Sequence, residues 1–273
     1  MSGLTPHTQL RKRDITVIKL GGGAVQSERA MNDLAAAVGD GWAEGRGIIM
    51  VNGGGKEIDT LCRRLSIETQ KVDGLRVTTP EVLEAVQMSL SKKSFEIALS
   101  LMGRGIAAVP LPAFAGGMVL CRRRPRLSGG QDLGLVGEIT SVDRSIIDAL
   151  FSRNALPVIY PLSTDNSGVL YNVNADEVAS SIASAVGATA LLLMTDVPGI
   201  MANSNVLKSI RCDEISPLLA NGQIREGMMP KVMSASSAAL SGVGRVCIMD
   251  GSRPDSLSAF FREGILNGTE IRV

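Results

Sequence analysis

The stretch Ile15-Thr-Val-Ile-Lys-Leu-Gly-Gly-Gly23 is typical of a buried strand that runs directly into a glycine turn. Its β-branched residues indicate the strand, and a helical pattern begins at about Glu28. A strand, a glycine turn and a helix start leave bare backbone N–H groups where an anion can bind. We therefore expect an anion site at the end of this strand.

A second glycine turn follows the same plan. Ile48-Ile-Met-Val-Asn52 precedes Gly53-Gly-Gly55, so two glycine turns should lie at the carboxyl ends of two strands of one sheet. Open α/β sheets bind ligands at this edge. Neither turn is a standard nucleotide motif, because the order G-x-x-x-x-G-K-[ST] is absent and the third glycine of the dinucleotide fingerprint is missing. A dinucleotide-dependent oxidoreductase is therefore disfavoured.

Strand patterns alternate with helical patterns along most of the chain, which predicts an α/β fold with a largely parallel sheet covered on both faces. Region 112–134 is the exception, because its prolines and glycines indicate hairpins or a loop. Arg122-Arg-Arg124 and Arg126 form a basic cluster there, which is either a solvated hairpin or a docking patch for an acidic partner. The predicted strands lie near residues 14–20, 47–52, 106–111, 135–140, 156–161, 190–194, 244–249 and 269–273.

Composition excludes several kinds of chemistry and partner. A net charge of +1 and an aromatic content of 3% argue against binding to nucleic acid or to an anionic membrane. The apolar runs have strand length, so no segment should span a bilayer. Four scattered cysteines without a C-x-x-C pair are typical of reduced thiols in a cytoplasmic protein. The only histidine is His7, which excludes a Ser-His-Asp triad, a Cys-His pair and a histidine zinc site.

The stretch Asn172-Val-Asn-Ala-Asp-Glu177 combines a helix start with a candidate charge site. Asn174 opens a capping-box pattern, and the helix should continue to about Val186. Asp176 then lies in the first turn, where the helix dipole favours a negative charge, so capping alone is one explanation of these residues. Asn172 points the same way as Asn174 on an extended segment. Their amides could instead hold a ligand carboxylate or a lysine-bound carboxylate.

The stretch Gly227-Met-Met-Pro-Lys231 precedes a helix rich in alanine and serine. Pro230 suits the first helical position, which puts Lys231 in the first turn. A lysine there is unfavourable by a few tenths of a kcal/mol up to about 1 kcal/mol. Lys19, at the end of an apolar strand, would also be costly if unpaired. Because a bound phosphate would compensate both charges, Lys19, Asp176 and Lys231 are candidates for a phosphoryl-transfer site.

The candidate residues belong to seven short motifs: Lys19-Leu-Gly-Gly22, Asn52-Gly-Gly-Gly55, Asp73-Gly-Leu-Arg-Val-Thr78, Gly134-Leu-Val-Gly-Glu138, Tyr171-Asn-Val-Asn-Ala-Asp176, Thr195-Asp-Val-Pro-Gly199 and Gly227-Met-Met-Pro-Lys231. In order and spacing they resemble the N-acetylglutamate kinase family of the amino acid kinase superfamily. The resemblance runs from Ile15 to the ending Gly268-Thr-Glu-Ile271. It implies a three-layer α/β/α sandwich around a mostly parallel sheet of about eight strands, the amino acid kinase or carbamate kinase-like fold.

The resemblance also implies an activity, which is ATP-dependent phosphorylation of the γ-carboxylate of N-acetyl-L-glutamate in arginine biosynthesis. Residues 1–172 would form the lobe that binds the acyl amino acid and makes a homodimer, and residues 173–273 would form the ATP lobe. Mg²⁺ would be held through the nucleotide phosphates and water. Because a γ-carboxylate is already ionised at neutral pH, no general base is required. The implied enzyme is a cytoplasmic phosphotransferase.

Residue roles are carried over from the matching motifs. Lys19 and Lys231 would contact the transferring phosphoryl group, and Asp176 would orient both lysines. Arg76 would hold the substrate α-carboxylate and Asn172 its acetylamino end. The implied substrate-binding residues are Gly54, Gly55, Arg76, Asn172 and Asn174, and the implied nucleotide-binding residues are Lys19, Gly21, Gly22, Thr195, Asp196 and Lys231.

The acceptor lobe departs from the family pattern in Ser89-Leu-Ser-Lys-Lys-Ser94, in Pro110–Gly117 and at Asn52. These departures keep alternative acceptors open: glutamate or 2-aminoadipate linked to an acidic carrier protein, for which the cluster from Arg122 to Arg126 would be a docking patch, or another acyl amino acid. A non-catalytic regulatory protein on the same scaffold is a further alternative. Since only 14 residues precede the first predicted strand, we expect a dimer without strong inhibition by arginine.

Overall fold

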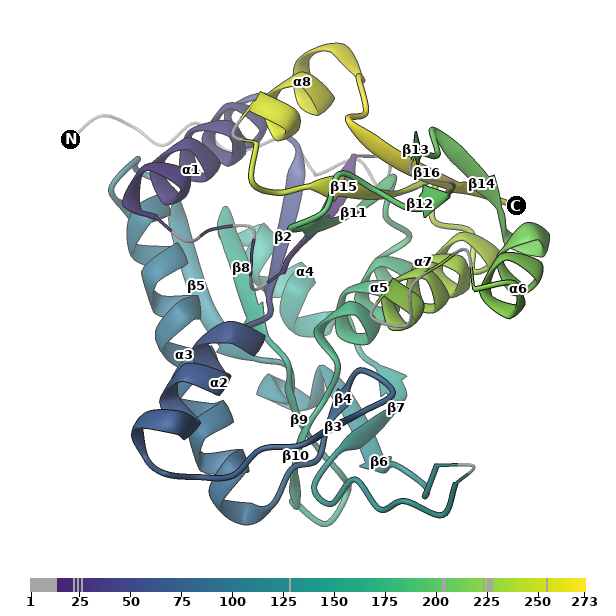
Figure 1. The fold of residues 1–273 in the computed structure, drawn as a ribbon. Coiled ribbons are helices and arrows are strands. Elements are labelled where there is room, and N and C mark those ends of the chain that lie inside the picture. The colour runs from purple at the N-terminus through teal and green to yellow at the C-terminus, as the bar shows by residue number, and fades with distance from the viewer. Residues whose placement is uncertain are drawn as a thin grey trace.

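The protein is an α/β sandwich, seen in a computed structural model that describes residues 14–21, 23, 25, 27–127, 129–202, 205–222, 224, 228–253 and 255–273. Helices pack on both sides of a central sheet, and a smaller sheet lies at one end of the molecule (Figure 1). Three residues of the sequence analysis, His7, Gly22 and Gly227, lie outside the described residues.

The central sheet has eight strands in the order β14-β16-β15-β11-β1-β2-β8-β5. Neighbouring strands are parallel except for the pair β15 and β16. Every residue of β1, β2 and β11 is buried, as expected of parallel strands that are covered on both faces. The strands are β1 (Ile15–Leu20), β2 (Gly47–Asn52), β5 (Ala107–Pro112), β8 (Ala155–Tyr160), β11 (Ala190–Thr195), β14 (Ser209–Arg211), β15 (Arg245–Asp250) and β16 (Gly268–Arg272).

Two helical layers cover this sheet (Figure 1). One layer consists of α1 (Glu28–Ala43), α3 (Pro80–Met102) and α8 (Asp255–Glu263), with α2 (Gly55–Arg64) packed on α3. The other consists of α4 (Ser145–Ser152), α5 (Ala175–Val186) and α7 (Met229–Leu240), with α6 (Cys212–Ala220) beside α7. The predicted three-layer α/β/α architecture is therefore confirmed.

The smaller sheet corrects one expectation. Its order is β10-β9-β6-β7, and β7 (Gly137–Val142) is the strand predicted near residues 135–140 as part of the main sheet. Only the first residue of β7 is buried, whereas the main-sheet strands beside β1 are buried throughout. The short strand β14 takes the eighth place in the main sheet. The remaining strands are β6 (Val119–Arg123), β9 (Leu162–Thr164), β10 (Leu170–Asn172), and the hairpins of β3 (Lys71–Val72) with β4 (Leu75–Arg76) and β12 (Met201–Ala202) with β13 (Asn205–Val206); a 3-10 turn spans Ala115–Gly117.

One hydrophobic core extends through both faces of the main sheet, and a smaller one lies between α2, α3 and the short strand β9. All four cysteines are unpaired, which confirms the expectation of free thiols. No helix in the described part of the chain is long and apolar enough to cross a membrane.

Candidate active site

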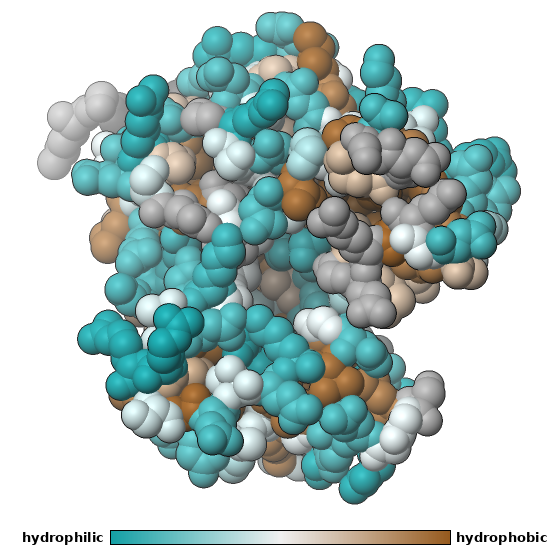
Figure 2. Space-filling view, in the orientation of Figure 1, coloured by the Kyte–Doolittle hydropathy of each residue, from teal (hydrophilic) through white to brown (hydrophobic). Residues whose placement is uncertain are grey.

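A cleft of about 340 Å³ opens at the carboxyl ends of β1, β2 and β11. Figure 2 shows this face of the molecule hollowed between the part that carries α7 and the part that carries the smaller sheet. The cleft has the position expected from the two glycine turns. All the candidate residues that the structure describes line it: Lys19, Gly21, Gly54, Gly55, Arg76, Asn172, Asn174, Asp176, Thr195, Asp196 and Lys231.

Lys19, Asp176 and Lys231 meet in this cleft although they are distant in sequence. Lys19 Nζ lies 2.7 Å from Asp176 Oδ1, and Lys231 Nζ lies 3.8 Å from Asp176 Oδ2. The lysine and aspartate of the shorter pair are both about 95% buried, whereas a quarter of the Lys231 side chain is exposed. Two ammonium groups thus share one carboxylate, so this group of three side chains carries one positive charge in excess.

The ends of two helices fix the second and third members of this group. Asn174 caps α5, and its Oδ1 accepts the N–H of Asp176 at 2.7 Å. α7 begins at Met229 with a proline in its first turn, so Lys231 lies in the first turn as predicted. Burial opposes ionisation of Asp176, but the charges of Lys19 and Lys231 outweigh it and hold the pKa of this carboxyl below its ordinary value.

The predicted capping box is only half present. Asn174 accepts backbone N–H groups as expected, but Glu177 does not close the box because its carboxylate pairs with Arg124 at 2.5 Å. Burial raises the pKa of Glu177 above its ordinary value, although Arg124 acts in the opposite direction. The arginine thereby links the smaller sheet to the helix that carries Asp176.

The first glycine of each turn, Gly21 or Gly53, continues a strand ladder, whereas the later glycines of the second turn begin a helix. The N–H of Gly21 donates to the carbonyl of Met194 at 2.8 Å, because the hydrogen-bond ladder between β1 and β11 continues by one residue. This N–H is therefore engaged rather than free for a phosphate, contrary to expectation. A Cβ at Gly21 would lie 2.7 Å from the same carbonyl oxygen, so only glycine fits there. Gly54 and Gly55 begin α2, whose first turn no described side chain caps.

Arg76 lies on β4, where it is buried at the side of the cleft. Its Nη2 contacts Asp59 Oδ1 at 2.5 Å and donates to the carbonyl of Gly55 at 3.2 Å. Its Nη1 is buried without a hydrogen-bond partner among the described residues. Asp59 also accepts from Lys71 at 2.9 Å. Although partial burial raises it, the pKa of Asp59 is held below its ordinary value by Lys71 and Arg76.

The two asparagines next to Asp176 have different surroundings. Asn172 Nδ2 donates to Thr78 Oγ1 at 3.2 Å. The amide oxygen of Asn174 is engaged in capping α5. Of the two, Asn172 is therefore the better placed to turn its amide oxygen to a ligand.

Thr195 and Asp196 follow β11 on the other side of the cleft. Thr195 is buried, and its hydroxyl lies 3.4 Å from Asp196 Oδ1. Asp196 Oδ2 accepts from Lys56 Nζ at 3.2 Å, and this hydrogen bond is the main reason why the pKa of Asp196 lies below its ordinary value. Lys56, Asp59 and Lys71 were not identified from the sequence, because each becomes a cleft residue only through a contact made in the folded protein.

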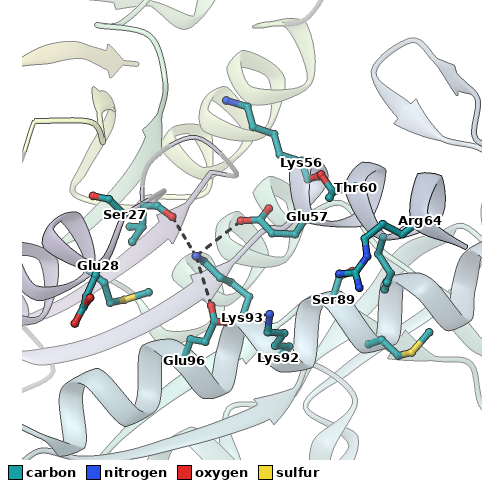
Figure 3. Close-up of a pocket in the computed structure, with 14 residues that line it drawn as sticks. Ser27, Glu28, Lys56, Glu57, Thr60, Arg64, Ser89, Lys92, Lys93 and Glu96 are labelled. Atoms are coloured by element: carbon teal, nitrogen blue, oxygen red, sulfur yellow. Dashed lines mark hydrogen bonds and ion pairs between the residues drawn. The ribbon is translucent and has the colours of Figure 1, made fainter.

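A larger groove of about 860 Å³ lies between α1, α2 and α3 (Figure 3). Lys93 occupies its centre, donates to the carbonyl of Val25 at 3.0 Å, and lies 3.8 Å from both Glu57 and Glu96. None of the residues predicted from the sequence lines this groove. Its size therefore does not mark it as the site of chemistry.

The arginines of the predicted basic cluster are each paired with a carboxylate of the same chain. Arg122 contacts Glu138 at 2.7 Å, Arg124 contacts Glu177, and the remaining two share Asp132 at 3.0 and 3.6 Å. Their charge is largely neutralised within the molecule. Among the described residues, no group of three or more His, Cys, Asp or Glu side chains gathers in a way that could hold a metal ion.

Comparison with known proteins agrees with this geometry. The sequence profile of the amino acid kinase family matches residues 14–250. The chain belongs to the amino acid kinase family. An acetylglutamate kinase of Archaeoglobus fulgidus is 38% identical over 262 residues, which cover 91% of this chain and 90% of that protein.

Two solved structures share the fold of this chain. The crystal structure of smu.665 from Streptococcus mutans UA159 has a TM-score of 0.82 at 28% identity and covers 96% of this chain and 99% of that one. Carbamate kinase from Giardia lamblia bound to AMP-PNP has a TM-score of 0.69 at 18% identity and covers 95% and 98%. The expected amino acid kinase or carbamate kinase-like fold is therefore confirmed.

Proposed function

We propose that this protein is an ATP-dependent phosphotransferase that phosphorylates the γ-carboxylate of N-acetyl-L-glutamate, a step of arginine biosynthesis. The observation that carries the proposal is the pairing of Lys19 and Lys231 with one buried aspartate in a cleft that retains a positive charge. Relatives named acetylglutamate kinase, 35–39% identical over more than nine-tenths of this chain, support the choice of acceptor.

The reaction needs charge neutralisation and alignment rather than a base. The acceptor carboxylate is ionised at neutral pH and attacks the terminal phosphorus atom of ATP, forming an acyl phosphate and releasing ADP. Lys19 and Lys231 stabilise the negative charge that spreads over the phosphoryl oxygens. Asp176 keeps both ammonium groups directed at that point. Mg²⁺, bound through the phosphates, would neutralise further charge.

The acceptor is held by groups that the structure leaves ready for an anion. Arg76 has one buried nitrogen without a partner among the described residues, and such a group is costly unless a ligand satisfies it. A substrate α-carboxylate would do so as a charge-assisted hydrogen bond. Asn172 would take the acetylamino end, with Gly54 and Gly55 beside the reacting carboxylate. In this arrangement residues 1–172 bind the acceptor, and residues 173–273, with Thr195 and Asp196, bind the nucleotide.

A free small molecule is favoured over a carrier-linked acceptor. The arginines that would dock an acidic carrier protein are already paired with carboxylates of this chain. A purely regulatory binding protein is disfavoured, because ligand binding alone does not require two lysines directed at one point.

The proposed enzyme is a homodimer formed through α3. Four large apolar side chains of this helix are 49–65% exposed at positions that share one helical face: Met88, Phe95, Leu99 and Met102. An exposed apolar stripe of this kind is typical of an interface. Light scattering should give the mass of a dimer, and Leu99→Glu should shift it to that of a monomer. A monomeric wild-type protein would contradict the proposal.

The activity itself is tested by trapping the acyl phosphate with hydroxylamine. Purified protein with Mg²⁺ and ATP should form a hydroxamate from N-acetyl-L-glutamate, in step with ADP release. Parallel reactions with free glutamate, 2-aminoadipate, their N-acyl derivatives and their carrier-linked forms define the acceptor. A product from the carrier-linked form alone would replace the proposed acceptor, and no hydroxamate from any of them would contradict the proposed function.

A further inference from the structure

Lys56 occupies an unusual place above the end of β1. It lies in the first turn of α2, directly after the second glycine turn, and its Nζ is 3.2 Å from Asp196 Oδ2. α2 follows β2, and Asp196 follows β11. Because β1 lies between β2 and β11 in the sheet, this ion pair passes over the carboxyl end of β1, where Lys19 lies.

Asp196 packs against the first glycine turn, and Lys56 directly follows the second, which lies beside Lys19. A Cβ at Gly23 would lie 2.5 Å from the Cβ of Asp196, so the aspartate can hold this position only beside glycine. On the other side, a Cβ at Gly53 would lie 3.7 Å from Cε of Lys19. The ammonium of Lys56 points away from Lys93 at the centre of the groove (Figure 3), and Lys56 also lines the cleft. Its charge is therefore directed to the same place as the charges of Lys19 and Lys231.

The Lys56–Asp196 ion pair is weak enough for an incoming phosphate to replace the aspartate as the partner of the lysine. Its side chains are 57% and 51% exposed, and ion pairs of this kind contribute little to stability. A lysine in the first turn of a helix is also repelled by the positive end of the helix dipole unless an anion is near. Asp196 supplies one negative charge, whereas a phosphate group supplies more charge and several acceptor oxygens. A phosphate that enters the cleft would compete with Asp196 for the ammonium.

We propose that Lys56 is a third phosphate-binding cation of the cleft, which Asp196 holds over the end of β1 until the terminal phosphate of a nucleotide replaces the carboxylate. This inference rests on the proposed function, because it takes the cleft to be the site of the nucleotide phosphates. It assigns Asp196 a second role, that of occupying the phosphate position in the empty enzyme.

Nucleotide binding tests the inference without turnover. Calorimetry would compare AMP with an ATP analogue that carries nitrogen between its β and γ phosphorus atoms. Lys56→Met should weaken binding of the analogue about tenfold and leave that of AMP within twofold, and Lys56→Arg should recover most of the loss. Lys92→Met is the matched control, because Lys92 is an exposed lysine of the neighbouring groove that does not line the cleft. Unchanged binding of the analogue by Lys56→Met, or an equal loss for AMP, would overturn the proposal.

The exchange step is tested by combining substitutions. If Asp196 competes with phosphate, Lys56→Met should weaken binding of the analogue more in an Asp196→Asn background than in the wild type, whereas equal losses would exclude the exchange.

Normal binding of the analogue by Lys56→Met in a protein that forms the hydroxamate would overturn this inference alone. A tenfold loss in a protein that forms no hydroxamate would overturn only the proposed function.

Discussion

Two clusters of lysine and carboxylate side chains lie on either side of α2, and they differ in the balance of charge. In the groove, Lys93 faces Glu57, Glu96 and the carbonyl of Val25, so one cation meets two anions. In the cleft, two lysines meet the single carboxylate of Asp176. The groove is the larger hollow, but its central lysine is already satisfied. The partners of the central group, two ammonium groups around one carboxylate in the cleft and two carboxylates around one ammonium in the groove, mark the anion site better than the size of the hollow does.

The largest effect is expected from removing either lysine of the cleft. Lys19→Met or Lys231→Ala should lower the maximal rate by roughly two orders of magnitude or more, equivalent to about 3 kcal/mol of barrier, because each lysine stabilises charge that grows during transfer. Michaelis constants should change far less. Steady-state assays of ADP release would measure both quantities. Near-normal turnover by Lys231→Ala would remove this lysine from the phosphoryl site.

Asp176, which pairs with Lys19 and Lys231, should affect both the stability of the protein and its rate of turnover. Asp176→Asn should slow turnover and lower the free energy of unfolding by about 2 kcal/mol at neutral pH, since a buried charge-assisted contact with Lys19 is lost. The pKa of Asp176 is depressed in the folded protein, so its contribution is complete above the unfolded value of about 3.9 and is lost as pH falls through the folded value. Urea unfolding of both proteins between pH 7 and pH 3 should therefore show the difference shrinking at the acid end. A difference that is constant with pH would contradict this assignment.

Arg76 tests the substrate side of the cleft. Because a guanidinium that grips a carboxylate does so in both the ground state and the transition state, Arg76→Ala should raise the Michaelis constant for N-acetylglutamate tenfold or more and change turnover less. Arg76→Lys should recover only part of the loss, since lysine offers a point charge instead of a two-pronged donor. The Michaelis constant for ATP serves as the internal control. An unaltered constant for the acceptor would show that Arg76 does not bind it.

The smallest effect is expected in the groove. Lys93→Met removes one hydrogen bond and two longer ion contacts, so the free energy of unfolding should fall by only about 1 kcal/mol. Turnover should stay within threefold of the wild type, because this ammonium does not line the cleft. Urea unfolding and ADP release would be measured on the same preparation. A hundredfold loss of turnover at normal stability would erase the distinction between the two clusters.

Local signals predicted most of the cleft. The start of α5 at Asn174 and the place of Lys231 in the first turn of α7 follow from capping and proline preferences, which depend only on neighbouring residues. The largely parallel sheet covered on both faces follows from alternating strand and helix patterns, and the resemblance to a known family implied the three-layer sandwich. Lys19 was found because a charged residue at the end of an apolar strand needs a partner.

The remainder depends on contacts between distant parts of the chain. Asp196 pairs with Lys56, 140 positions away, and no periodicity indicates such a contact. Likewise, β7 has the sequence of a strand, but its pattern does not say which sheet it joins. The N–H of Gly21 was expected to be free. It is engaged because the register between β1 and β11 brings it to the carbonyl of Met194, and the sequence does not indicate that register.

The register of β1 joins the folding of the protein to its chemistry. Lys19 lies opposite Val51 on one side and Leu193 on the other. A shift of one residue would turn every side chain of β1 to the opposite face of the sheet and direct Lys19 away from Asp176. The same shift would disrupt the packing of Ile18 and Leu20, which are buried. The pairing of this strand therefore sets two properties at once: a chain that completes the sheet correctly directs Lys19 to Asp176, and a chain that misaligns β1 loses the packing of the core and that contact together.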